Sequence, residues 1–162
     1  MMKILIVSDT HRRDENLRYV LEREAPFDML IHLGDAEGSE YEIEKWVEPG
    51  CRLEMVMGNN DFFSSLNRET ELNLGPHRAL LTHGHYYNVS LGVELLRSEA
   101  IDRGCDIAMY GHTHRPFLEI GDQVTILNPG SLSYPRQEGR KPSYMVMTLG
   151  GDGKAEYRTC YL

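Results

Sequence analysis

Cysteine is scarce in this chain of 162 residues, and its scarcity excludes two kinds of cross-link. The three cysteines, Cys51, Cys105 and Cys160, are odd in number, lie far apart and form no Cys-x-x-Cys pair. Such a set provides neither a disulfide framework nor a thiolate zinc site, and it is typical of a reducing compartment. The chain is long enough to bury a hydrophobic core without cross-links. We therefore expect a single domain over residues 1–162.

Long apolar runs are also missing. The first apolar run, Ile4 to Val7, is far shorter than the roughly 7–15 residues of a signal-peptide core or the roughly 20 residues of a membrane span. We therefore expect a cytoplasmic protein with no membrane partner. A hydrophobic content of 41% and a charged content of 26% are ordinary for a globular protein, which agrees with that expectation.

Positive charge is in short supply as well. The chain has 17 lysines and arginines against 25 aspartates and glutamates, for a net charge of −8. Nucleic-acid backbones favour a basic surface, so we expect no nucleic-acid partner. An anionic small molecule is not excluded, because divalent cations bound among clustered carboxylates would reverse the local field. The sequence is also compatible with a homo-oligomer.

The first half of the chain alternates buried strands with amphipathic helices. Apolar runs at 3–7, 29–33 and 53–57 predict strands that are buried on both faces. Helices are expected from Asp14 to just before Pro26 and over 39–47. This alternation is typical of a parallel α/β sheet with right-handed crossovers.

The second half has a different pattern. Glycine-containing turns separate short apolar runs within 70–81, 117–127 and 144–161, which predicts three hairpins. A helix over 93–104 and a strand over 107–110 lie between the first two hairpins. Antiparallel strands after parallel units predict a mixed sheet or two sheets packed together. The segment 133–142 is rich in proline, glycine and basic residues, and we expect a mobile surface loop there.

Five short motifs follow directly on predicted strands and share one chemistry. They are Asp9-Thr10-His11, Gly34-Asp35, Gly58-Asn59-Asn60-Asp61, His83-Gly84-His85 and Gly111-His112-Thr113-His114. Any one of them resembles ordinary turn sequence, because Asp, Asn, Gly and His all favour turns. Turn chemistry does not explain why all five strand ends carry carboxylate, amide or imidazole groups. In open α/β sheets ligands bind beyond the carboxyl ends of the strands, so we expect these groups to converge.

The composition of this set indicates a metal site. Two carboxylates, four imidazoles, an amide oxygen and no thiolate suit divalent ions such as manganese, iron, zinc, cobalt or nickel. One tetrahedral zinc ion takes only four ligands, whereas two ions about 3.5–4 Å apart would use the whole set. Asp35, alone at its strand end, is the best candidate to be shared between two ions. The candidate ligands are Asp9, His11, Asp35, Asn59, His83, His112 and His114.

The ordered motifs, extended by Asn128-Pro129-Gly130-Ser131, resemble those of the calcineurin-like metallophosphoesterase family. The short chain is most similar to the small bacterial and archaeal phosphodiesterase branch. The resemblance implies an α/β fold, a four-layer α/β/β/α sandwich of two mixed sheets flanked by helices, with metal ions at one edge of the paired sheets. It also implies two sets of ligands. One ion would be held by Asp9, His11, Asp35 and His114, and the other by Asp35, Asn59, His83 and His112.

The resemblance further implies a metal-dependent phosphodiesterase with manganese as the leading metal, in which a hydroxide bridging the two ions attacks a small phosphate ester. Larger relatives usually carry a histidine directly after the Gly-Asn pair as a proton donor. This chain has Asn60 there, an amide with no proton to give. We take His85 as the candidate general acid, with water as the fallback and a supporting or solvated role as its alternative, and Asp61 as a residue that orients its neighbours. His32 and His77 are expected to be structural or exposed.

Three other functions are open at this stage. A retromer subunit related to this family uses the same fold mainly as a protein-binding scaffold, and its metal residues are partly replaced. This chain keeps Asp35 and Asn59 in their matching motifs, which favours catalysis. A phosphomonoesterase would use the same site. A metal sensor or store ranks last, because such proteins seldom need a bridging carboxylate and an open coordination site.

Overall fold

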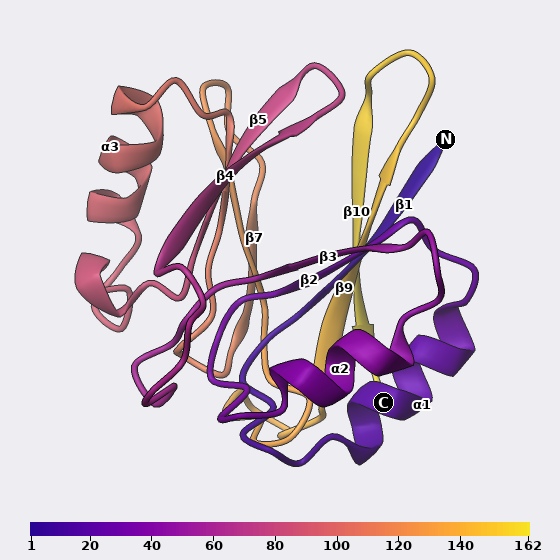
Figure 1. The fold of residues 1–162 in the computed structure, drawn as a ribbon. Coiled ribbons are helices and arrows are strands. Elements are labelled where there is room, and N and C mark those ends of the chain that lie inside the picture. The colour runs from indigo at the N-terminus through magenta and orange to yellow at the C-terminus, as the bar shows by residue number, and fades with distance from the viewer.

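The computed structural model describes residues 1–162 as two five-stranded sheets that pack face to face (Figure 1). The first sheet has the strand order β10-β9-β1-β2-β3. Its strands are β1 (Met2–Val7), β2 (Met29–His32), β3 (Arg52–Met55), β9 (Ser143–Leu149) and β10 (Ala155–Tyr161). Strands β1, β2 and β3 run parallel, because α1 (Glu15–Glu24) and α2 (Glu40–Trp46) return the chain to the same end of the sheet each time. The predicted alternation of strands and helices is confirmed.

The second sheet has the strand order β4-β5-β6-β8-β7. Its strands are β4 (Glu69–Leu74), β5 (His77–Thr82), β6 (Ile107–Met109), β7 (Pro116–Glu119) and β8 (Thr125–Pro129). The three central strands run parallel, and β4 and β7 lie antiparallel at the edges. Helix α3 (Glu94–Asp102) connects β5 to β6, and the single-turn 3-10 helix η1 (His85–Tyr87) begins three residues after β5. All three predicted hairpins are present, and they belong to two separate sheets.

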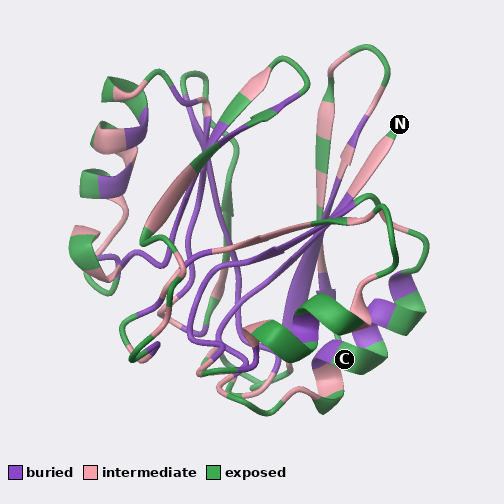
Figure 2. Ribbon diagram, in the orientation of Figure 1, coloured by how far each residue is buried: buried purple, intermediate pink, exposed green.

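The sheets and helices form four layers. Figure 1 shows α3 outside the second sheet and α1 with α2 outside the first. Successive side chains of β1 serve different layers: Ile4 and Ile6 are buried between the sheets, whereas Leu5 and Val7 pack against α1. The buried residues in Figure 2 accordingly lie along both sheets, and the exposed ones lie on the outer helix faces, the loops and edge strands such as β7 and β10. Full burial of each such aliphatic side chain contributes about 1.5–3 kcal/mol.

The carboxyl ends of the parallel strands of both sheets meet at one edge of the molecule. There the imidazole of His83, just after β5, lies 2.7 Å from the carbonyl oxygen of Leu33, just after β2. The turns of the β4–β5 and β9–β10 hairpins lie at the opposite edge, at the top of Figure 1. No helix in the structure has both the length and the apolar character that a membrane crossing requires.

His77 ties the two sheets together at the hairpin edge. Its Nδ1 lies 2.7 Å from Asp106 Oδ2, and its Nε2 lies 2.8 Å from the carbonyl oxygen of Gly153, in the β9–β10 turn. The hydrogen bond to Asp106 raises the pKa of His77 above its ordinary value of 6.5. Only the protonated ring donates to both oxygens at once, so His77 has the structural role that the sequence predicted.

We expect His77→Gln to lower the free energy of unfolding by less than about 1 kcal/mol, with the larger loss at low pH. Because the folded pKa lies above the unfolded one, the stabilisation is fully present below the unfolded pKa and is lost as the pH rises through the folded pKa. Urea denaturation of both proteins at about pH 6 and about pH 9 measures the difference. A loss as large at the higher pH as at the lower would contradict this account of His77.

Candidate metal centre

Five of the predicted ligands converge at the edge where the strands end. Asp9 and His11 follow β1, Asp35 follows β2, His83 follows β5, and His114 lies in the loop after β6. Their ligand atoms form two groups in which every atom lies within 4.8 Å of the others. The first group is Asp9, His11 and His114, and the second is Asp9, Asp35 and His83.

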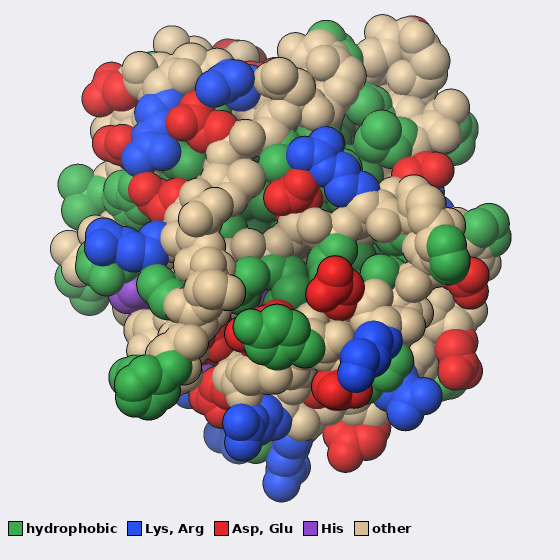
Figure 3. All heavy atoms as spheres, in the orientation of Figure 1, with side chains coloured by type: hydrophobic (Ala, Val, Ile, Leu, Met, Phe, Trp, Pro, Cys, Tyr) green, Lys and Arg blue, Asp and Glu red, His purple; other side chains and the backbone are tan.

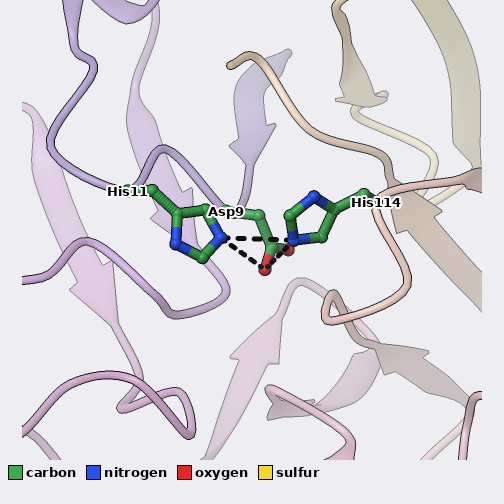
Figure 4. A group of neighbouring side chains, drawn as sticks. All are labelled: Asp9, His11 and His114. Carbon is green, nitrogen blue, oxygen red and sulfur yellow. Dashed lines mark hydrogen bonds and ion pairs between the residues drawn. The ribbon is translucent and has the colours of Figure 1, made fainter. Parts of the chain in front are cut away.

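The atoms of the first group face one another closely (Figure 4). Asp9 Oδ1 lies 3.3 Å from His114 Nε2 and 3.7 Å from His11 Nε2, and the two Nε2 atoms are 3.2 Å apart. Ligands placed tetrahedrally at about 2.0–2.1 Å from a metal are separated from each other by about 3.3–3.4 Å. The observed separations of 3.2 to 3.7 Å therefore fit a single bound cation.

The second group shares a carboxylate with the first. Asp9 Oδ1 also lies 3.7 Å from His83 Nε2. Asp35 Oδ2 lies 3.3 Å from His83 Nε2 and 3.8 Å from His11 Nε2, so it reaches imidazoles of both groups. The sequence predicted a shared position for Asp35 alone, whereas the geometry gives one to both carboxylates.

Three imidazoles are oriented by hydrogen bonds on their outer sides. His83 Nδ1 donates to the Leu33 carbonyl and His114 Nδ1 to the Tyr134 carbonyl, each at 2.7 Å. His11 Nδ1 lies 2.8 Å from the Glu37 carboxylate. Because a carbonyl oxygen can only accept, Nδ1 of His83 and His114 carries a proton, and in the neutral ring that binds a metal the lone pair of Nε2 would point into the site. Metal-binding histidines in proteins are usually held in this way.

Two atoms of the site are buried without any hydrogen-bond partner, namely Asp9 Oδ1 and His83 Nε2. Both residues are fully buried. Leaving a buried polar atom unpaired costs about 1–3 kcal/mol, and more when the group is charged. The two atoms face each other across 3.7 Å, and a cation between them would satisfy both.

The electrostatics of the site favour ionised carboxylates beside positive charge. Burial alone would raise the pKa of Asp9, but His83, His11 and His114 hold it well below its usual range. Burial alone would lower the pKa of His83, but the carboxylates of Asp9 and Asp35 raise it to about 9, and similar contacts raise that of His11 to about 9. The protonated imidazoles thus provide the positive charge that bound cations would otherwise provide.

The backbone of the site is strained. Left-handed backbone is uncommon for residues that carry a Cβ, and a residue held there costs of the order of 1–3 kcal/mol. Five predicted ligands adopt it, with φ values between 48° and 70°. They are Asp9, His11, Asp35, His112 and His114. Backbone strain at five ligand positions indicates that the surrounding fold holds these residues so that their side chains point into the site.

Two glycines allow the ligand loops to approach one another. A Cβ at Gly58 would collide with the carboxylate of Asp35, and one at Gly111 would collide with the hydroxyl of Ser8 and lie 2.7 Å from Asp9 Oδ2. The lack of a Cβ at these two positions therefore permits the close approach of the backbone.

Asn59 and His112 lie at the rim of the second group. His112 Nδ1 is 3.1 Å from Asn59 Oδ1, and the His112 ring centre is 5.1 Å from that of His83. Asn59 is exposed. The backbone N–H of His112 donates to Asp9 Oδ2 at 3.0 Å, which ties its loop to the centre. The structure therefore places both residues beside the site, outside the two tight groups.

The three residues considered for catalysis take different positions. Asn60 donates through its amide to Asp35 Oδ2 at 3.0 Å and through its backbone N–H to Asp35 Oδ1 at 2.9 Å. Asp61 is buried, and its carboxylate accepts from the backbone N–H groups of Asp35, Gly58 and Glu37 at 2.7–2.8 Å. Asn60 and Asp61 thus contact the loops that carry the ligands.

His85 is the third of these residues, and it lies at the mouth of the site. Its ring centre is 5.5 Å from that of His83, and it stacks against Tyr86 at 4.1 Å. Its Nδ1 is buried without a hydrogen-bond partner. Burial, together with His83 and His112, lowers the pKa of His85.

Sequence reasoning missed the groups that hold the ligands in place. Glu37 and the carbonyl oxygens of Leu33 and Tyr134 had no role assigned. Glu37 could have been noticed, because it lies two residues after Asp35 and its side chain is acidic. A backbone carbonyl carries no signal in the side-chain sequence, so the other two could not have been found.

His32 has the structural role that the sequence allowed for it, and Ser131 has a structural role as well. His32 is fully buried and links Thr10 Oγ1, at 2.9 Å, to the backbone N–H of Gly34, at 3.1 Å. Burial lowers its pKa to about 4, so it is neutral. Ser131 donates to the carbonyl oxygen of Asp9 at 2.8 Å. Both residues support the loops on which the ligands lie.

Comparison with known proteins now identifies the family. Residues 2–152 match the model of the calcineurin-like phosphoesterase superfamily domain. The chain belongs to this family. It is 34% identical over 152 residues to YsnB, a probable metallophosphoesterase of Bacillus subtilis. The aligned region covers 93% of this chain and 86% of YsnB. It is 30% identical over 146 residues to a phosphodiesterase of Methanocaldococcus jannaschii, covering 80% of this chain and 83% of the relative.

A solved structure gives the same fold. Vps29 of Entamoeba histolytica, crystallised with Zn²⁺, superposes with a TM-score of 0.77 and 20% identity, covering 99% of both chains. The predicted metallophosphoesterase sandwich is therefore confirmed. Membership of this family also confirms the predicted class of enzyme, a metal-dependent hydrolase of phosphate esters.

We expect a saturating divalent cation such as Mn²⁺ to raise the melting temperature of the chelator-treated protein by about 5–10 °C. A ligand at about 100 times its Kd stabilises a protein by about 2.7 kcal/mol, and each kcal/mol shifts the melting temperature of a protein of about this size by roughly 2–4 °C. Asp35→Asn should abolish most of that shift, and Glu42→Gln, an exposed carboxylate on α2, should retain it. A full shift in Asp35→Asn would contradict this description of the site.

Proposed function

We propose that this protein is a phosphodiesterase whose site holds two divalent cations, with manganese as the leading candidate. The observation that carries the proposal is the pair of buried, unpartnered atoms, Asp9 Oδ1 and His83 Nε2, within a cage of ionised carboxylates and oriented imidazoles. Oxygen and imidazole ligands without thiolate suit manganese, iron, zinc, cobalt and nickel. The substrate is a small phosphate ester.

The residues divide naturally between two cations. Asp9, His11 and His114 would hold the first, with Asp35 Oδ2 within reach. Asp35 and His83 would hold the second, together with Asn59 and His112 after a small shift of the rim side chains. We take residues 1–162 as one domain for this function, because the first sheet supplies the carboxylates and the second supplies His83 and His114.

When bound, two such cations would make a water molecule more acidic and so a better nucleophile, and they would neutralise charge on the phosphoryl oxygens. The chain itself supplies orientation. The outer hydrogen bonds of His83 and His114 keep Nε2 aimed inward without reorganisation. Asn60 fixes both oxygens of Asp35, and Asp61 fixes the backbone on either side of it.

Proton transfer to the leaving oxygen is assigned to His85, in accordance with its place at the mouth of the site. Its lowered pKa leaves it mostly neutral near pH 7. Only a small fraction of the protein molecules therefore carries the proton that His85 would donate. Asn60 cannot replace it, because an amide has no acidic proton. Leaving groups that depart as stable anions, such as aryl oxides, should therefore react best.

The alternative is a protein-binding scaffold on the same fold. The structural likeness to a vacuolar protein sorting protein favours it at the level of fold. A scaffold has no need of a strained ligand cage, and this chain brings five candidate ligands into two tight groups with Asn59 and His112 beside them. We therefore rank the phosphodiesterase first and the scaffold as its main rival, and a phosphomonoesterase would use the same site.

The Mn²⁺-loaded protein should hydrolyse an aryl phosphodiester, bis(p-nitrophenyl) phosphate, faster than alkyl phosphomonoesters. His85→Gln should lower kcat about tenfold to a hundredfold for alkyl leaving groups and less than about threefold for aryl ones, because general acids typically contribute about 10²–10⁴. Steady-state kinetics with matched substrates measure both effects.

Asp35→Asn serves as the blank for these assays. Faster hydrolysis of alkyl monoesters than of aryl diesters would contradict the reading of Asn60 and His85. Absence of any metal-dependent activity, with Asp35→Ala folded as the wild type, would favour the scaffold.

A further inference from the structure

A polar cavity opens directly beside the first group of ligands, Asp9, His11 and His114. It has a volume of about 710 Å³, and its walls include His11 and His114 together with Arg115, Arg136 and Arg140. Ligand pockets typically measure about 300–1,000 Å³, so a group of nucleotide size would fit. Only one of its eight lining residues is hydrophobic, which excludes an apolar ligand.

The three arginines of this cavity have no carboxylate partner. Several other arginines are paired with carboxylates, as Arg52 is with Glu54 at 2.7 Å and Arg78 with Glu71 at 3.0 Å. Three unpaired arginines thus gather at one cavity in a chain whose net charge is −8. Figure 3 shows lysine and arginine side chains that project from the lower edge of the molecule, where Figure 1 places the loops that follow the strands.

The loop that carries Arg136 and Arg140 is hydrogen-bonded to a candidate ligand, and Arg115 directly follows that ligand in the sequence. His114 Nδ1 donates to the carbonyl of Tyr134 at 2.7 Å, and the N–H of Arg136 donates to the carbonyl of His114 at 3.0 Å. Further along, the N–H of Arg140 donates to the carbonyl of Gln137 at 2.9 Å, which closes a turn. The backbone at Tyr134 and Arg136 is therefore held against the candidate ligand His114.

One carboxylate, that of Glu37, also lines the cavity. It lies 2.8 Å from His11 Nδ1 and forms no ion pair with any of the three arginines. The exposed arginines are left free to bind an anion. The planar guanidinium group presents donors in a fork that matches two phosphate oxygens at once.

We propose that this arginine cavity binds a second phosphate group of the substrate, so that the preferred substrates are diesters of an alcohol that carries another phosphate. The inference rests on the proposed function, because the scissile phosphate would lie at the metal centre. The cavity shares His11 and His114 with that centre, so the two phosphates would lie side by side on one ligand.

Two matched compounds test this inference. They are thymidine 5′-(p-nitrophenyl phosphate) and the same compound with a 3′-phosphate. Calorimetry with metal-free protein measures binding without any catalysis. We expect the wild type to bind the 3′-phosphorylated compound at least about tenfold more tightly, since charge-assisted hydrogen bonds are the stronger kind. The double variant Arg136→Gln/Arg140→Gln should bind the two compounds about equally, whereas the control variant Arg52→Gln should retain the preference.

Equal binding of the two compounds by the wild type, or a preference that survives in the double variant, would overturn the inference. Release of p-nitrophenolate by the Mn²⁺-loaded wild type is followed separately. A binding preference without release would refute the proposed function and leave the anion site standing. Release with no preference for the 3′-phosphate would refute the anion site alone.

Discussion

The placement of two ionised carboxylates in the interior is the constraint on which the rest of the structure depends. Asp9 is fully buried and Asp35 nearly so, and both lie within 4 Å of imidazole nitrogens. Carboxylates buried this close together repel each other and require compensating positive charge. In the absence of cations, raised pKa values of His11 and His83 provide that charge. The family to which the chain belongs indicates that metal provides it in the working protein.

The fold meets this constraint through backbone geometry at the strand ends. Left-handed residues at Asp9, Asp35 and His114 turn their side chains inward. Glycines remove the Cβ atoms that would keep the loops apart, most clearly at Gly58 against Asp35. Each sheet alone would present half a site, and packing the sheets face to face brings the halves together. The stability supplied by the core between the sheets is thus what holds a strained and charged edge in place.

The sequence could predict those parts of the arrangement that depend on the type and spacing of side chains. Alternating apolar runs gave the strands and helices, and the five motifs gave the ligands that follow them, because strand ends in α/β folds gather at one edge. The sequence could not reveal that Leu33 and Tyr134 hold His83 and His114, since the contacts use backbone carbonyls. Nor did it reveal that Asp9 reaches both ligand groups, which depends on a loop conformation set by contacts distant in sequence.

The central claim is that these groups form a cage for a pair of cations. The most direct measurement is anomalous scattering from crystals of the protein soaked in Mn²⁺. The account predicts two peaks at the strand edge about 3.5–4 Å apart, one beside His11 and His114 and one beside His83, with Asp9 and Asp35 adjacent. A map without peaks there, with the carboxylates and imidazoles turned away from one another, would contradict it.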